Sequence, residues 1–332
     1  MLIEHDQNVV MEITAPNFHA RFVRILHFRA RPTFSFMFRF LLVLALVLSF
    51  QGGSWAGAGL KQELETLTAG MPATVGIAVI IDGGETVTVN NDQRFPLMSV
   101  FKFHQALAVV ERCRQQGLPL ETEIWITRDD LPPNTWSPLR DARPEGGFSI
   151  SIAELLRHTL QQSDNNACDI LFDRICSVPD TEAYIHGLGI RDCAIRATEA
   201  DMHADTANCR QNWTTPLATA RLMERFLTGN ILPAADRDFL MATMLGCTTG
   251  ENRLARPLAG TGATLGHKTG TSDRDAQGRL MALNDAGFVL LPDGRHYTIA
   301  VFIMDSRASD AETEALVADL SACVGRHVAG TR

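Results

Sequence analysis

Hydrophobic runs typical of β-strands lie near both ends of the chain. Val75 to Ile81 (VGIAVII) is one such run, and after a turn at Asp82-Gly83-Gly84 a second run extends from Thr86 to Val89. Two strands joined by a short glycine-containing turn predict a β-hairpin. Three further strand candidates lie in the last quarter of the chain, at Thr264 to Thr271, Ala286 to Leu291 and His296 to Met304.

The stretch between these groups of strands shows helical spacing of apolar residues, interrupted by Pro and Gly. Segments of this kind are Ala153 to Leu160, Asn166 to Ile175 and Leu217 to Leu227, and helices are also expected at Leu60 to Leu67 and Ala311 to Val324. We therefore predict an α+β fold of the α/β sandwich type. Strands from both chain ends would form one antiparallel five-stranded sheet, an all-helical lobe would be inserted between them, and the active site would lie in the cleft between the lobes.

The amino-terminal region has the pattern of a secretory signal peptide. Arg39 precedes the apolar run Leu41 to Phe50, and small residues follow it up to Ala58. A run of this length is shorter than the roughly 20 residues that cross a bilayer, and a basic flank with small residues after the run is typical of a cleavable signal. A buried core helix is the alternative, which these flanks disfavour.

Three expectations about organisation follow. Residues 1–58 would be an N-terminal extension and signal peptide, with Met37 as a candidate start. The mature protein would be periplasmic, without stable membrane association. Residues 59–332 would form a single domain, in which 59–95 and 250–332 build the sheet lobe and 96–249 the helical lobe.

Composition and charge exclude several classes of protein. The chain of 332 residues has a formal net charge of −8 and is 45% hydrophobic, which excludes a disordered, collagen-like or coiled-coil protein. The acidic balance argues against nucleic acid as a partner. Its only lysines are Lys61, Lys102 and Lys268, among many arginines. A buried lysine can lose its proton whereas arginine cannot, so the few lysines are candidates for chemistry.

The cysteines give no metal-site pattern. No two of them form a CxxC pair, so a zinc site is not predicted and we expect no metal. Export would permit disulfides. A bridge between Cys193 and Cys209 is one candidate, and two buried thiols are the alternative.

Three short motifs could carry chemistry. Ser99 and Lys102 lie three residues apart at the start of an apolar helix, so they share one face, and a buried lysine can activate a hydroxyl. Ser163-Asp164-Asn165 begins a second helix, where a simple helix cap is the alternative. Lys268-Thr269-Gly270-Thr271 ends a strand, where the glycine allows close approach to the backbone and the threonines offer hydroxyls to a carboxylate.

Together, in this order, the three motifs resemble the Ser-x-x-Lys, Ser-Asp-Asn and Lys-Thr-Gly set of class A β-lactamases and penicillin-binding proteins. The resemblance covers nearly the whole mature chain. Glu199 matches the glutamate that activates the deacylating water in class A enzymes. His203, which stands where the usual motif has Asn, resembles the extended-spectrum subgroup typified by the PER enzymes.

The resemblance implies a role for each residue. Ser99 would be the nucleophile, Lys102 or Glu199 the base for acylation, Ser163 the proton relay and Glu199 the base for deacylation. The substrate would be bound by Asn165, Lys268, Thr269, Gly270 and Thr271, and the remaining candidates around the cleft are Trp136, His203 and Arg253. For Trp136 a packing role, for His203 a loop-capping role and for Arg253 an ordinary surface position are the alternatives.

The predicted activity is hydrolysis of β-lactam antibiotics through an acyl-enzyme, by a monomer without a cofactor, with penicillins and cephalosporins (oxyimino types among them) as substrates. Two rivals share Ser99, Lys102, Ser163 and Lys268: a D-alanyl-D-alanine peptidase, and a penicillin sensor domain that remains acylated. Both would deacylate slowly, so Glu199 counts against them.

Overall fold

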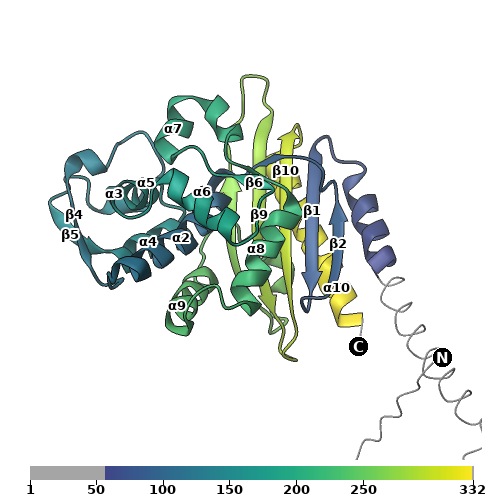
Figure 1. The fold of residues 1–332 in the computed structure, drawn as a ribbon. Coiled ribbons are helices and arrows are strands. Elements are labelled where there is room, and N and C mark those ends of the chain that lie inside the picture. Colours follow the sequence, from purple (N-terminus) through teal and green to yellow (C-terminus); the bar gives the residue numbers. More distant parts are fainter. Residues whose placement is uncertain (1–56, 331–332) are drawn as a thin grey trace, which may run out of the picture. The chain divides into compact units, whose positions relative to one another are not determined.

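A five-stranded antiparallel sheet forms the centre of the sheet lobe, as expected. The computed structural model describes residues 57–330, and the predicted signal peptide lies almost entirely outside them. The sheet order is β2-β1-β10-β9-β8, so strands from both ends of the described chain lie side by side (Figure 1). Its strands are β1 (Thr74–Ile81), β2 (Glu85–Val89), β8 (Thr264–Thr271), β9 (Leu280–Leu290) and β10 (His296–Ser306).

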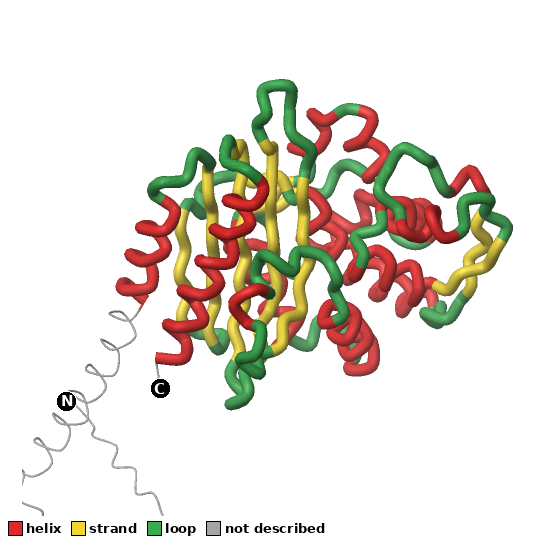
Figure 2. Tube along the Cα trace, turned by 180° about the vertical axis from the view of Figure 1, so that it is seen from behind, coloured by secondary structure: helices red, strands yellow, loops and turns green. Residues whose placement is uncertain are grey.

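Both faces of the sheet are covered, because alternate residues of each strand point to opposite sides. Ile77 and Val79 of β1 belong to a core shared with the helix at 57–68 and with α10 (Asp310–Gly330), which lies across the sheet in Figure 2. Ala78 and Ile80 face the other way, into a larger core that includes α8 (Pro216–Thr228). The β-hairpin and the closing helix predicted from the sequence are therefore present.

Residues between β2 and β8 form mainly helices, with short strands that the pattern did not predict. The helices besides α8 are α2 (Phe101–Gln116), α3 (Pro138–Ala142), α4 (Ile152–Gln161), α5 (Asn165–Arg174), α6 (Val178–Gly187), α7 (Glu199–Ala204) and α9 (Ala234–Leu245). The short strands are β3 (Phe95–Pro96), β4 (Glu123–Ile126), β5 (Phe148–Ser151), β6 (Cys193–Ala194) and β7 (Trp213–Thr214). The inserted part is thus helical with small two- and three-stranded sheets.

Local capping explains where several helices begin. Ser151 accepts a hydrogen bond from the amide of Glu154 and the Glu154 carboxylate bonds back, which closes a capping box at the start of α4. Ser177 and Thr215 cap α6 and α8, each followed by proline in the first turn. Such caps satisfy amides that have no partner within the helix.

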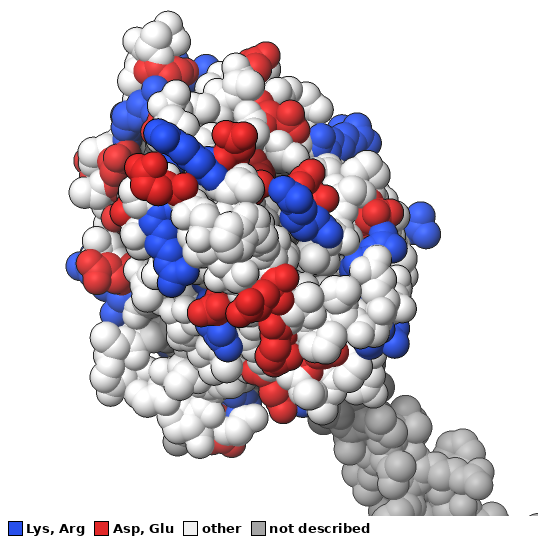
Figure 3. All heavy atoms as spheres, turned by 90° about the vertical axis from the view of Figure 1, so that its left-hand side faces the viewer, with Lys and Arg blue, Asp and Glu red and all other residues white. Residues whose placement is uncertain are grey.

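The surface of the helical end carries both signs of charge. On the face shown in Figure 3, Lys and Arg side chains are interspersed with Asp and Glu. Within residues 57–330, no helix is long and apolar enough to cross a membrane.

Candidate active site

Ser99 and Lys102 lie at the junction of a short 3-10 turn and a long helix. Ser99 sits in the turn Met98–Val100, and Lys102 in the first turn of α2, which begins at Phe101. Met98 has a φ of 43°, a conformation that is costly for a residue with a side chain. Lys102 is fully buried, as its predicted role requires, among Ser163, Asn165 and Glu199.

The Lys102 ammonium group is surrounded by oxygen atoms. Its Nζ lies 2.9 Å from Oε1 of Glu199, donates to Oδ1 of Asn165 at 2.6 Å and to the backbone oxygen of Ser163 at 2.8 Å. Three acceptors match the three N–H bonds of a protonated lysine. The structure therefore brings together parts of two sequence motifs and the separate Glu199.

Glu199 is the first residue of α7 and faces the nucleophile. The hydroxyl of Ser99 donates to Oε1 of Glu199 at 3.2 Å. The loop is held from behind by Asp169, whose carboxylate accepts hydrogen bonds from the amides of Glu199 (2.9 Å) and Ala200 (2.8 Å). Burial is the main reason why the pKa of Asp169 is raised to about 6. Asp169 was not predicted from the sequence, because no neighbouring motif marks it.

A second support of this loop is the buried amide of Asn212. Its Oδ1 accepts from the amides of Arg196 (2.7 Å) and Ala197 (3.0 Å), and its Nδ2 donates to the oxygen of Ala197. These bonds hold the segment just before Glu199. This structural role of Asn212 was not predicted from the sequence.

Ser163 connects the two buried lysines. Its Oγ accepts a hydrogen bond from Nζ of Lys268 at 2.9 Å and lies 3.5 Å from Nζ of Lys102. Ser163 has a φ of 59°, and the following Asp164 caps α5 by accepting from the amide of Ala167. The helix cap and the functional interpretation of this motif are thus both compatible with the structure.

Lys268 lies on β8 and is fully buried. Burial, followed by the charge of Lys102, lowers the pKa of Lys268 to about 7. Its Nζ donates to Ser163 and to the backbone oxygen of Thr269. Among the described residues it forms no ion pair with a carboxylate, which leaves its charge available to an anionic ligand.

Gly270 allows β8 to pass close to the nucleophile. A Cβ at this position would lie 2.8 Å from the backbone oxygen of Leu97 and 3.1 Å from the amide nitrogen of Ser99. The strand edge next to Thr271 therefore approaches the Ser99 backbone more closely than any side chain would permit. This is the close approach predicted for the glycine.

The three peripheral candidates differ in their surroundings. The Trp136 side chain is 61% exposed and its Nε1 donates to the backbone oxygen of Gln162. Arg253 is buried, and its guanidinium donates to Oγ1 of Thr271 at 2.8 Å, so it reaches the Lys-Thr-Gly strand from behind. His203 is exposed at the end of α7, and its role as a ligand to substrate remains a prediction.

The proposed Cys193–Cys209 bridge is wrong, because the structure contains seven free cysteines. The Cys193 thiol points to the oxygen of Ile190 and the Cys209 thiol to the oxygen of Met202. Both are buried, so the alternative of two buried thiols holds. Within 57–330, no group of three or more His, Cys, Asp or Glu side chains is arranged to hold a metal ion.

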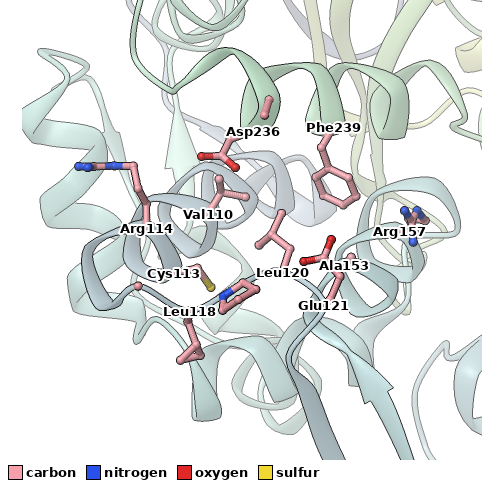
Figure 4. A pocket seen from close by; sticks show the side chains of 13 residues that line it. Val110, Cys113, Arg114, Leu118, Leu120, Glu121, Ala153, Arg157, Asp236 and Phe239 are labelled. Carbon is pink, nitrogen blue, oxygen red and sulfur yellow. The ribbon is translucent and has the colours of Figure 1, made fainter.

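A cavity of about 390 Å³ lies apart from the predicted site residues. Figure 4 shows its lining, which comes from α2, α4, α9 and the segment between α2 and β4, and includes Cys113, Leu120 and Phe239. Charged groups of both signs, Arg114, Arg157, Glu121 and Asp236, also face it. None of the predicted site residues lines this cavity, so we assign it no part in the chemistry.

A serine hydroxyl beside a carboxylate, with a buried lysine in contact with that carboxylate, is an arrangement suited to nucleophilic catalysis by serine. Comparison with known proteins agrees. The model of the β-lactamase enzyme family matches residues 59–328. A β-lactamase of Bacteroides uniformis is 41% identical over 266 residues, which is 80% of this chain and 90% of the relative.

Two further similarities define the class. The extended-spectrum β-lactamase PER-1 of Pseudomonas aeruginosa is 37% identical over 263 residues, covering 79% of this chain and 85% of the relative. The crystal structure of a class A β-lactamase from Bacteroides cellulosilyticus superposes with a TM-score of 0.79 at 39% identity, covering 82% of this chain and 98% of the other. The chain therefore belongs to the class A β-lactamases. It is a serine hydrolase of β-lactam antibiotics, and such hydrolysis confers resistance, as predicted from the motifs.

Proposed function

We propose that Ser99 attacks the lactam carbonyl and forms an acyl-enzyme, which Glu199 then releases by activating water. The observation that carries this proposal is the hydrogen bond from the Ser99 hydroxyl to Glu199. The same carboxylate contacts the nucleophile and is paired with Lys102 at 2.9 Å, so it is placed to accept a proton both in acylation and in deacylation.

Glu199 is also the better candidate for the base in acylation. Nζ of Lys102 lies within 2.9 Å of oxygen atoms of Glu199, Ser163 and Asn165, and among the described residues it makes no hydrogen bond to Ser99. Glu199 accepts the hydrogen bond from Ser99 and has the lone pairs that a base needs. Lys102 would hold Glu199 in place and balance its charge.

The departing lactam nitrogen would receive its proton from Ser163. Because Oγ of Ser163 accepts from Lys268, its own proton is free to point into the cleft. Lys268, with its pKa lowered to about 7, can replace that proton at neutral pH. The oxyanion would be bound by the backbone amides of Ser99 and Thr271, whose spacing Gly270 permits.

The substrate carboxylate would bind to Lys268, Thr269 and Thr271, with Arg253 orienting the Thr271 hydroxyl and Asn165 contacting the acyl side chain. Trp136 would form a wall of the cleft and His203 would contribute from the Glu199 loop. The similarity to PER-1, named as an extended-spectrum enzyme, supports a substrate range that includes oxyimino-cephalosporins.

The mechanism is tested with the purified protein and a chromogenic cephalosporin, with ring opening followed by absorbance and the protein by intact mass. Ser99→Ala should form no adduct. Glu199→Ala should form its adduct more slowly and then retain it, with turnover reduced by about 10²–10⁴-fold, the usual contribution of a general base. Glu251→Gln, an exposed glutamate, is the matched control and should behave as the unmodified enzyme. Fast deacylation in Glu199→Ala would refute the assigned role.

We also propose that the protein is exported, that residues 59–332 form one monomeric domain with the two lobes given above, and that the mature protein is periplasmic. The apolar run with its basic and small-residue flanks supports export. After expression in a Gram-negative host, the intact mass of periplasmic protein should correspond to a start near residue 57–59. Recovery of uncleaved protein in the cytoplasm would contradict the proposal, and light scattering would test the monomer.

A further inference from the structure

A second cluster of reactive side chains lies next to the Lys-Thr-Gly strand. It consists of Cys247, in the turn after α9, His267 on β8 and Asp285 on β9. Nδ1 of His267 is 2.8 Å from Oδ1 of Asp285, and the other carboxylate oxygen accepts from the amide of Leu254 at 3.2 Å. The order thiol, imidazole, carboxylate is one that activates cysteine nucleophiles in proteins.

The fully buried Asp285 makes His267 a cation. Burial alone would lower the pKa of His267, but the charge and hydrogen bond of Asp285, followed by those of Cys247, raise it to about 10. The Cys247 thiol therefore faces an imidazolium, with the charge of Lys268 nearby. Burial raises the pKa of Cys247, whereas the hydrogen bond and charge of His267 and the charge of Lys268 lower it to about 7 overall.

The other cysteines lack this environment. Cys247 is partly exposed, and each of the remaining six is buried. Burial raises the pKa of Cys113 to about 11 and that of Cys193 to about 12. Since the thiolate is the nucleophile and accessibility is required for reaction, Cys247 should react well before the others.

Cys247 is also connected to the substrate-binding strand. Its Sγ lies 3.4 Å from Oγ1 of Thr249, which in turn lies 2.6 Å from Oγ1 of Thr269. A group added to the sulfur would therefore lie next to the Thr249 hydroxyl that bonds to Thr269. Modification of the Cys247 thiol would therefore disturb the strand that is proposed to bind the substrate carboxylate.

We propose that Cys247 is a modification site that takes small disulfides by thiol–disulfide exchange, and that the adduct lowers β-lactam hydrolysis. The Cys247 thiolate attacks one sulfur of the reagent, the reagent's S–S bond breaks as the mixed disulfide forms, and the other half leaves as a thiolate that takes a proton from water. A reducing thiol reverses the reaction. His267 is a positioning residue here, since it stabilises the thiolate and transfers no atom.

The purified protein is incubated with glutathione disulfide over pH 5.5–9, and adducts are counted by intact mass and located by peptide mapping. We expect one adduct, on Cys247, with a rate that rises with pH around a midpoint near 7. Cephalosporin hydrolysis should fall about tenfold, as expected for loss of a hydrogen bond in the site, and should recover on reduction. The expected loss of hydrolysis rests on the substrate-binding role proposed for Thr269. Labelling of Cys247 does not depend on that role and is measured separately, by mass.

Three variants sharpen the test. Cys247→Ser should gain no adduct and keep its activity in the presence of the disulfide, and Cys113→Ser, the matched control, should behave as the unmodified protein. His267→Asn should move the midpoint above pH 8, towards that of an ordinary thiol. If His267→Asn fails to fold, the proposal is tested by the pH midpoint of labelling in the unmodified protein. A midpoint above 8, an adduct spread over the buried cysteines, or full activity of the Cys247 adduct would overturn the proposal.

Discussion

Replacing Gly270 by alanine tests whether close approach of β8 to the nucleophile is needed for catalysis. The added Cβ would lie 2.8 Å from the backbone oxygen of Leu97 and 3.1 Å from the amide nitrogen of Ser99. Both contacts are with backbone, which cannot rotate away. The strand or the turn at Ser99 must therefore move by about 0.6 Å to reach an ordinary contact of 3.4 Å.

A displacement of this size should cost catalysis more than stability. A misplacement of about 1 Å can reduce rates about 10²-fold, and loss of one oxyanion donor costs about 10²–10³-fold. We therefore expect Gly270→Ala to lower kcat/KM for a cephalosporin by about 10–10²-fold. The strain itself should destabilise the fold by about 1–3 kcal/mol.

Gly266→Ala on the same strand is the matched control. Its Cβ would collide with the ring of Phe288, in the core and not at the nucleophile. The stability of both variants is measured by thermal unfolding. Their kcat/KM is measured by steady-state kinetics well below the unfolding midpoint and is expressed per folded molecule. Gly266→Ala should lose stability and keep kcat/KM within about threefold. If Gly270→Ala were as active as Gly266→Ala, the close approach would not serve catalysis.

Three further predictions concern residues around the site. Asn212→Ala should lower the free energy of unfolding by about 2–4 kcal/mol in denaturant titration, because two amides lose their acceptor, while Asn212→Asp, which keeps both, should lose less. Arg253→Met removes the donor to Thr271, so KM for carboxylate substrates should rise about tenfold and kcat should change little; an equal fall in kcat would contradict a binding role. Lys268 carries its charge below its pKa of about 7 and loses it above, so kcat/KM for these substrates should fall by up to about tenfold per pH unit above 7, and a flat profile would be inconsistent with this.

The sequence predicted the sheet well where strands are apolar and poorly where they support the site. β8 was predicted to the residue, at Thr264–Thr271. β9 was predicted from Ala286 but begins at Leu280, because Asn284 and Asp285 interrupt its apolar pattern. Both are fully buried, and their polar groups bond to Leu97 and His267, respectively. Two polar residues whose hydrogen-bond partners lie far away in the sequence look like a loop when only the sequence is read.

The same reason separates the site residues that were found from those that were missed. Ser99 with Lys102, and Lys268 with its neighbours, are local patterns of residue types suited to one chemistry. Asp169 bonds to amides about 30 positions further along the chain, and Thr249 bonds to Thr269 across 20 positions. Neither residue has a local sequence signal, since a single Asp or Thr is common on any surface. Their supporting roles could therefore be identified only from the structure.

The charges of the site explain why Lys268 remains free to bind an anion. Asp285 is the cross-strand neighbour of Thr269 and could have neutralised Lys268, but its charge is taken by His267 and its second oxygen by the amide of Leu254. Glu199 is likewise paired with Lys102. Lys268 is thus buried with hydroxyl and carbonyl hydrogen-bond partners only. Burial and then the charge of Lys102 lower its pKa, and the charges of Cys247, Glu199 and Asp285 offset this only in part. A substrate carboxylate would supply a direct ionic partner, so the unfavourable burial of Lys268 in the free enzyme is relieved on binding, and the pairing of Asp285 with His267 leaves that position open until then.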